Sequence, residues 1–100
     1  MISIKLSNRF KKIVRDSGRE DEVTATLVLI KEGFGRPHSH SGLSIRKLGK
    51  DLYESRTSLS WRLAFMAAKG ELIFDFAGNH YEVQSYLRGR RSKNYPVVVR

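Results

Sequence analysis

Residues 51–65 read DLYESRTSLSWRLAF, and this stretch predicts two antiparallel strands joined by a short turn near Ser58. In the second strand the apolar residues at 59, 61, 63 and 65 alternate with Arg62 and its small or polar neighbours. A period of two is typical of a strand with one buried face. Pairing of the two strands is therefore expected to bring Glu54, Arg56 and Arg62 together on the other face. Folding alone does not require that grouping, so it is a candidate site.

The composition indicates one basic domain, residues 1–100, with an anionic partner. The chain has 19 Lys and Arg against 10 Asp and Glu, a formal net charge of +9. An excess of this size in a short chain favours nucleic acid as the partner, although runs of charge are often no more than solvated surface. The basic runs supply these candidate RNA-binding residues: Lys47, Lys50, Arg88, Arg90 and Arg91.

Cysteine is absent from the sequence, which excludes disulfides, thiolate metal sites and thiol nucleophiles and fits a reducing compartment. No stretch approaches the roughly 20 apolar residues of a membrane span. The first residues are interrupted by Lys5 and Arg9 and do not resemble a signal peptide. We therefore expect a cytoplasmic protein with no membrane partner.

The first third of the chain predicts a strand followed by a helical hairpin. Residues 1–6 alternate like a half-buried strand, and Ser7 is a plausible N-cap for an amphipathic helix. Gly18 breaks that helix. Ser17 and Glu20 stand at capping-box spacing for a second helix, which is expected to run to a C-cap at Gly33.

Residues 34–42, FGRPHSHSG, have the composition of a surface loop. Its two histidines, His38 and His40, raise the possibility of a metal site. Zinc sites normally recruit three or four protein ligands, and no third nitrogen or carboxylate lies nearby in the sequence. We therefore expect neither a metal nor a cofactor.

The second half predicts an antiparallel meander and a closing helix. Residues 43–48 and 71–77 add strands on either side of the 51–65 pair, with Leu72, Phe74 and Phe76 sharing one face. After Gly78, Asn79 and Glu82 form a capping box for a helix whose inner face carries Val83, Tyr86 and Leu87. The tail, 95–100, is compatible with an edge strand or with an arm that docks elsewhere. The fold class is therefore α+β.

This order of elements resembles the RelE/ParE toxin superfamily. The resemblance spans nearly the whole chain and rests on KLGKDLYESR at 47–56, SWRLAF at 60–65 and FAGNHYEVQSYL at 76–87. It implies the toxin of a type II toxin–antitoxin system. RelE-like members are endoribonucleases that cut mRNA, commonly on the ribosome, and are silenced by a cognate antitoxin, whereas ParE-like members poison DNA gyrase.

The resemblance also implies catalytic residues. Glu54 and Arg56 stand on the strand that carries charged site residues in RelE-type toxins, and Arg62 matches an arginine that follows an aromatic residue on the next strand. His80, two residues beyond Gly78, and Tyr86 on the last helix match a basic and an aromatic position. The ribosome-dependent prototype has lysine where this chain has Glu54, and related members with glutamate there are thought to use it as the general base.

The chemistry of RNA cleavage supports the same residues. Cleavage without a metal needs a base for the 2′-hydroxyl, cations for the phosphorane and an acid for the 5′ leaving oxygen. Arg62 can bind a phosphate bidentately, and histidine suits either proton role. Which of Glu54 and His80 is the base remains open. Three other readings also remain open: a cross-strand ion pair without function, a gyrase inhibitor, and a nucleic-acid-binding module without catalysis.

Overall fold

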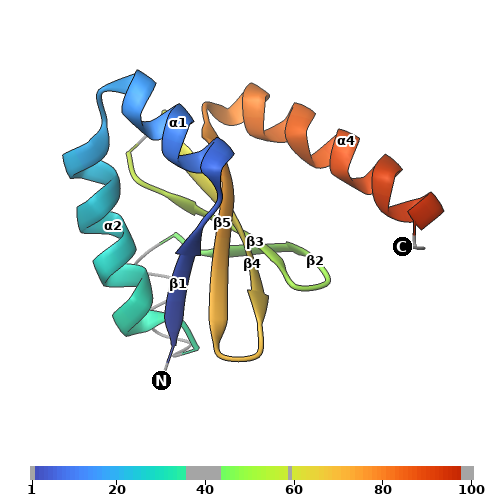
Figure 1. Cartoon of the computed structure of the whole chain (residues 1–100), viewed down its shortest axis with the longest axis horizontal. Coiled ribbons are helices and arrows are strands. Elements are labelled where there is room, and N and C mark those ends of the chain that lie inside the picture. The colour runs from blue at the N-terminus through green and yellow to red at the C-terminus, as the bar shows by residue number, and fades with distance from the viewer. Residues whose placement is uncertain (1, 36–43, 59, 98–100) are drawn as a thin grey trace.

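A single five-stranded mixed sheet organises the protein, with strand order β1-β5-β4-β3-β2 (Figure 1). The computed structural model describes residues 2–35, 44–58 and 60–97. In chain order the elements are β1 (Ser3–Leu6), α1 (Asn8–Ser17), α2 (Glu20–Gly33), β2 (Arg46–Gly49), β3 (Leu52–Arg56), β4 (Arg62–Ala68), β5 (Glu71–Gly78) and α4 (His80–Val97). Strands β2 to β5 form the predicted antiparallel meander, and β1 joins β5 in parallel.

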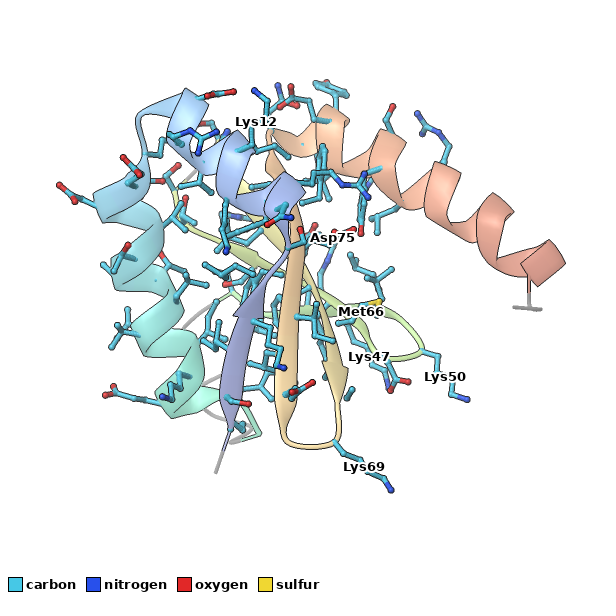
Figure 2. All side chains as sticks on the ribbon, viewed as in Figure 1. Lys12, Lys47, Lys50, Met66, Lys69 and Asp75 are labelled. Atoms are coloured by element: carbon cyan, nitrogen blue, oxygen red, sulfur yellow. The ribbon has the colours of Figure 1, made fainter. Side chains whose placement is uncertain are left out.

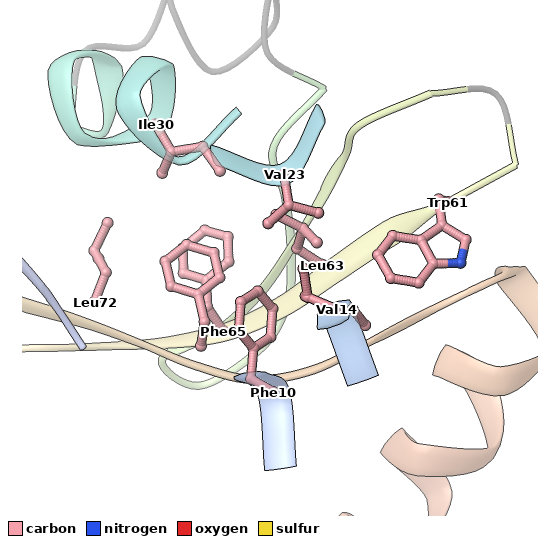
Figure 3. Packing of buried hydrophobic residues seen from close by; sticks show 10 residues of the cluster. Phe10, Val14, Val23, Ile30, Trp61, Leu63, Phe65 and Leu72 are labelled. Carbon is pink, nitrogen blue, oxygen red and sulfur yellow. The ribbon is translucent and has the colours of Figure 1, made fainter. Parts of the chain in front are cut away.

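The main core lies between the sheet and the hairpin of α1 and α2, on the left in Figure 1. Phe10 and Val14 from α1 and Ile30 from α2 pack toward the sheet, as Figure 3 shows. Phe65 and Phe74 are fully buried and stack with ring centroids 4.6 Å apart. The alternation in 51–65 predicted this burial of Phe65, and that of Trp61, which is 7 % exposed.

Two of the predicted helix signals are confirmed and one is wrong. Ser7 caps α1, because its Oγ accepts from the backbone N–H of Phe10 at 3.0 Å, and Gly18 ends it in the left-handed conformation at φ 75°. Ser17, however, does not open α2. Its hydroxyl donates back to the carbonyl of Val14 at 2.7 Å, and α2 begins after Arg19 without a side-chain cap.

The end of α2 also differs from expectation. Gly33 is the last helical residue and is buried, and the C-cap is Phe34 in an extended conformation. The ring of Phe34 meets those of Tyr53 and Phe65 edge-on, at 5.1 and 5.8 Å. The aromatic contact therefore fixes the exit from α2. The loop histidines, His38 and His40, lie outside the described residues.

Strand β5 contains an irregularity that the sequence pattern did not predict. The pairing with β4 joins Phe74 to Phe65 and Phe76 to Ala64, so Asp75 is an extra residue on β5. A bulge of this kind reverses the alternation beyond it. The expectation that Phe76 shares a face with Phe74 is therefore wrong: Phe76 lies on the opposite face, while Ala77 enters the main core.

Helix α4 packs on that opposite face. The predicted capping box is confirmed: the Glu82 N–H donates to Asn79 Oδ1 and the Asn79 N–H donates to Glu82 Oε1, both at 2.8 Å. Val83 and Leu87 are buried, and the ring of Tyr86 stacks on Phe76 at 4.7 Å.

Helix α4 is longer than the short helix expected. It continues to Val97, so the expectation of an edge strand is wrong for residues 95–97, while docking of the tail elsewhere stays a prediction. Within the described part of the chain, no helix is long and apolar enough to span a membrane.

Candidate functional site

Glu54 is the centre of the site that the 51–65 stretch predicted. Residues Glu54 and Ala64 are cross-strand partners, as are Arg56 and Arg62, so the three charged residues share the sheet face opposite the main core. Arg62 Nη1 donates to Glu54 Oε2 at 2.8 Å. The predicted convergence of Glu54 and Arg62 is therefore present in the structure.

A second arginine binds the same carboxylate oxygen and was not predicted. Arg46 on β2 lies opposite Glu54 on β3, and its Nη2 is 3.2 Å from Glu54 Oε2. The sequence pattern predicts a strand at 43–48 but not its register. The basic run at 46–50, in which Arg46 is the arginine, was the feature of the sequence that could have indicated this contact.

Burial separates the two arginines. The Glu54 side chain is 5 % exposed and that of Arg62 is 14 % exposed, whereas Arg46 is 61 % exposed. Glu54 Oε1 and Arg62 Nε are buried and lack a hydrogen-bond partner among the described residues. Unsatisfied buried polar atoms are rare in folded proteins. Each such atom reduces the net stability that the pair contributes.

Arg56 and His80 lie at the same end of the three inner strands, β3, β4 and β5. Arg56 is the last residue of β3 and is exposed. Arg62 pairs with Gly78, and His80 follows two residues later as the first residue of α4. His80 is exposed, and its ring lies edge-on to Tyr81 at 5.4 Å. Arg56, Arg62 and His80 therefore lie at the same end of these strands.

Tyr86 belongs to a different cluster, which the sequence analysis missed. Its hydroxyl donates to Asp75 Oδ2 at 2.7 Å. Arg9 from the start of α1 donates to the same oxygen at 3.2 Å, and its guanidinium lies 5.5 Å from the centre of the Tyr86 ring. Asp75 is the extra residue of the β5 bulge, beside the start of α1 in Figure 2. No sequence pattern signalled this contact between residues 66 positions apart.

The predicted RNA-binding residues are dispersed. Lys47 on β2, Lys50 in the following turn and Arg88 on α4 are exposed. Figure 2 shows Lys50 extending away from the sheet, as does Lys69 in the turn between β4 and β5. Arg90 and Arg91 lie within α4, and their side chains are outside the described set. The described residues contain no group of three or more side chains suited to a metal ion.

Compared by sequence, the chain matches no protein-family model and no curated protein. Solved structures do match. YafQ from E. coli superposes with a TM-score of 0.65 at 15 % identity, over 83 % of this chain and 98 % of that one. In the E. coli DinJ–YafQ toxin–antitoxin complex the TM-score is 0.64 at 17 % identity, over 81 % and 94 % of the two chains. The YoeB–YefM complex from Staphylococcus aureus gives 0.57 at 15 % identity, over 81 % and 99 %.

These superpositions show that the chain has the α+β fold of YafQ and YoeB, as the order of its elements predicted.

Proposed function

We propose that this protein is the toxin of a type II toxin–antitoxin system and acts as a metal-independent endoribonuclease that cleaves mRNA on the ribosome. The observation that carries the proposal is the Arg62 guanidinium, held by the buried carboxylate of Glu54 on the sheet face opposite the main core. The RelE-like fold and the charge of +9 support the same class. Fold alone does not define an activity, so the proposal rests on the site.

The proposed reaction is attack of an RNA 2′-oxygen on the adjacent phosphorus. The O2′–P bond forms and the P–O5′ bond breaks, which leaves a 2′,3′-cyclic phosphate on one product and a 5′-hydroxyl on the other. One group takes the proton of the 2′-hydroxyl and a second delivers a proton to the 5′-oxygen. Negative charge develops on the phosphorane between these transfers, and fixed cations stabilise it.

Arg62 is the proposed phosphorane ligand. Its Nη1 is engaged by Glu54, which fixes the plane of the guanidinium. A preorganised cation contributes most where charge develops in the transition state, because no reorganisation is needed at that moment. Arg56, exposed at the end of β3 across from Arg62, is placed to bind a neighbouring phosphate oxygen.

Glu54 is proposed to position the arginines. Both arginines approach its Oε2, and its Oε1 is buried. A general base must lie within hydrogen-bond reach of the proton that it abstracts. Since neither oxygen of Glu54 faces solvent in this arrangement, we assign one of the two proton transfers to His80, which is exposed at the same end of the strands as Arg62.

The partner proposed is a cognate antitoxin protein. YafQ and YoeB are each seen in complex with a second protein, DinJ and YefM respectively. Co-expression of this chain with the small proteins encoded beside its gene tests the proposal. One of them should bind the chain and restore growth, and failure of all of them contradicts the toxin assignment.

The activity is tested in a reconstituted translation reaction with a defined mRNA, in which RNA ends are mapped and their termini identified. Wild-type protein should produce cuts that end in 2′,3′-cyclic phosphate. Arg62→Lys should reduce single-turnover cleavage at saturating ribosome by about 100-fold, because it keeps the charge but loses the bidentate geometry. Arg46→Lys is the matched control, since Arg46 binds the same carboxylate from a mostly exposed position.

Two results contradict the proposal. Equal, small effects of the two substitutions favour diffuse electrostatic binding without a catalytic arginine. Intact transcripts together with double-strand DNA breaks in cells that express the protein favour inhibition of DNA gyrase instead.

A further inference from the structure

A shallow cavity, wide open to solvent, lies on the sheet face opposite the main core and has no role in the reaction described above. Its volume is about 550 Å³. The lining comes from the start of α1, from β5 and from the first two turns of α4: Arg9, Phe76, Tyr81, Glu82, Ser85 and Tyr86. Three of these six residues are aromatic.

One wall of the cavity is rigid. Phe76 and Tyr86 stack with an interplanar angle of 5°, and Asp75 binds both the Tyr86 hydroxyl and Arg9 through one oxygen. Glu82 is fixed by the capping box at the start of α4. These side chains are thus ordered without a ligand, which lowers the entropic cost of binding one.

Tyr81 forms an exposed aromatic wall. Its side chain is 80 % exposed, the highest exposure among the large hydrophobic residues that the structure describes. Its ring is T-shaped to that of His80, and most of its surface is open to solvent. The main core does not include Tyr81. An aromatic ring in this position is suited to stacking with a planar ligand.

The polar groups of the cavity suit a base better than a phosphate. The charge of Arg9 is balanced by Asp75, and the Glu82 carboxylate at the rim repels anions. Arg9 nevertheless remains 55 % exposed and offers further N–H donors, while Glu82 and Ser85 offer acceptors. An unstacked nucleobase stacks on aromatic rings and forms hydrogen bonds through its edges, so it fits this combination of groups.

The position of the cavity places such a base close to the proposed chemistry. Phe76, Ala64 and Glu54 are successive cross-strand partners on one face of the sheet. Since neighbouring strands lie about 4.8 Å apart, Phe76 is roughly 10 Å from Glu54. The ring of His80 contacts that of Tyr81 in the cavity lining.

We propose that this cavity binds one unstacked base of the RNA strand that is cleaved, with Tyr81 as the stacking surface and Arg9, Glu82 and Ser85 at the edges of the base. The proposal rests on the endoribonuclease function and deepens it. The net charge of +9 favours an anionic partner, and the aromatic rings of the lining favour the bases of an RNA strand.

The test compares binding of short single-stranded RNAs that carry a non-cleavable 2′-O-methyl backbone. One series has every base, and the other has one abasic position moved stepwise along the strand, so the phosphates are unchanged. For the wild type, loss of the base at one position should weaken binding roughly 5- to 100-fold. In Tyr81→Ala that position should lose its effect, and in Tyr81→Phe the effect should remain.

Lys11→Ala is the matched control, because Lys11 is an exposed cation of α1 that does not line the cavity. Its loss should weaken binding of every RNA equally and leave the dependence on the base intact. An unchanged base dependence in Tyr81→Ala overturns the base site. This result is distinct from failure of the proposed function, which shows as absence of cleavage of an unmodified mRNA by the wild-type protein.

Discussion

The two arginines on Glu54 differ enough in burial that their removal should have different effects on stability. Loss of a partner from a buried ion pair leaves an uncompensated charge and costs about 3–5 kcal/mol. Arg62 is 14 % exposed and Glu54 is 5 % exposed, while Arg46 stays to bind the carboxylate, so the lower end applies. We expect Arg62→Ala to lower the free energy of unfolding by about 3 kcal/mol.

Arg46→Ala should cost much less, because solvent screens a side chain that is 61 % exposed. Exposed ion pairs contribute about 0.2–1 kcal/mol. For a domain of this size, about 3 kcal/mol corresponds to a fall in melting temperature of roughly 12–24 °C. The same conversion gives at most about 8 °C for Arg46→Ala.

Trp61 provides the assay. It is the one tryptophan of the sequence and is 7 % exposed in the folded protein, so its fluorescence reports unfolding in urea. Because Trp61 adjoins Arg62, circular dichroism should be recorded as a second, independent probe. Unfolding energies of the two variants that agree within about 0.5 kcal/mol would refute the reasoning, since burial would then not govern the strength of this pair.

Three further changes test the local structure. Gly78→Ala should lower the free energy of unfolding in urea, because the added Cβ would meet Glu82 Oε1 at 2.7 Å and break the capping box. Gly89→Ala, whose Cβ would have no atom within 4 Å, should be neutral or stabilising. Equal effects of the two substitutions contradict this explanation. Ser7→Ala should cost about 1 kcal/mol through loss of the bond to the Phe10 N–H, and an unchanged urea midpoint argues against the cap. The Lys12 ammonium lowers the pKa of Asp16 by a hydrogen bond and by its charge. The wild type should therefore be more stable to urea than Asp16→Asn near neutral pH, and this difference should disappear as the pH falls below 3.8. A difference in stability that persists in acid contradicts this explanation.

The alternation of residues 51–65 was sufficient to predict the contact between Glu54 and Arg62. Side chains on paired strands repeat with a period of two, so the face of each residue follows once the pairing is assumed. Capping boxes are predictable for the same reason: Asn79 and Glu82 need only each other. Local periodicity was thus enough to predict the fold class, the meander and the face on which the charged residues lie.

The features that the sequence did not predict depend on strand register and on contacts between residues far apart in the chain. The partnership of Arg46 with Glu54 requires the alignment of β2, which shifts between Lys47 and Gly49. A bulge such as Asp75 leaves no mark in the hydrophobic pattern, so Phe76 was assigned to the wrong face. Ser17 shows a further limit, because a hydroxyl at capping-box spacing can equally close the preceding helix.

The pairing of β1 with β5 has a consequence for how the protein is made. Ser3 to Leu6 are aligned with Glu71 to Phe74, so the first strand to be synthesised waits for one that is translated almost 70 residues later. The long loop that must close before these contacts form slows folding. Before β5 is translated, β4 lacks its partner strand, so Arg62 and Ala64 cannot pair with Gly78 and Phe76. His80, which follows β5, is also still missing. A nascent chain therefore lacks the assembled site until His80 has been translated.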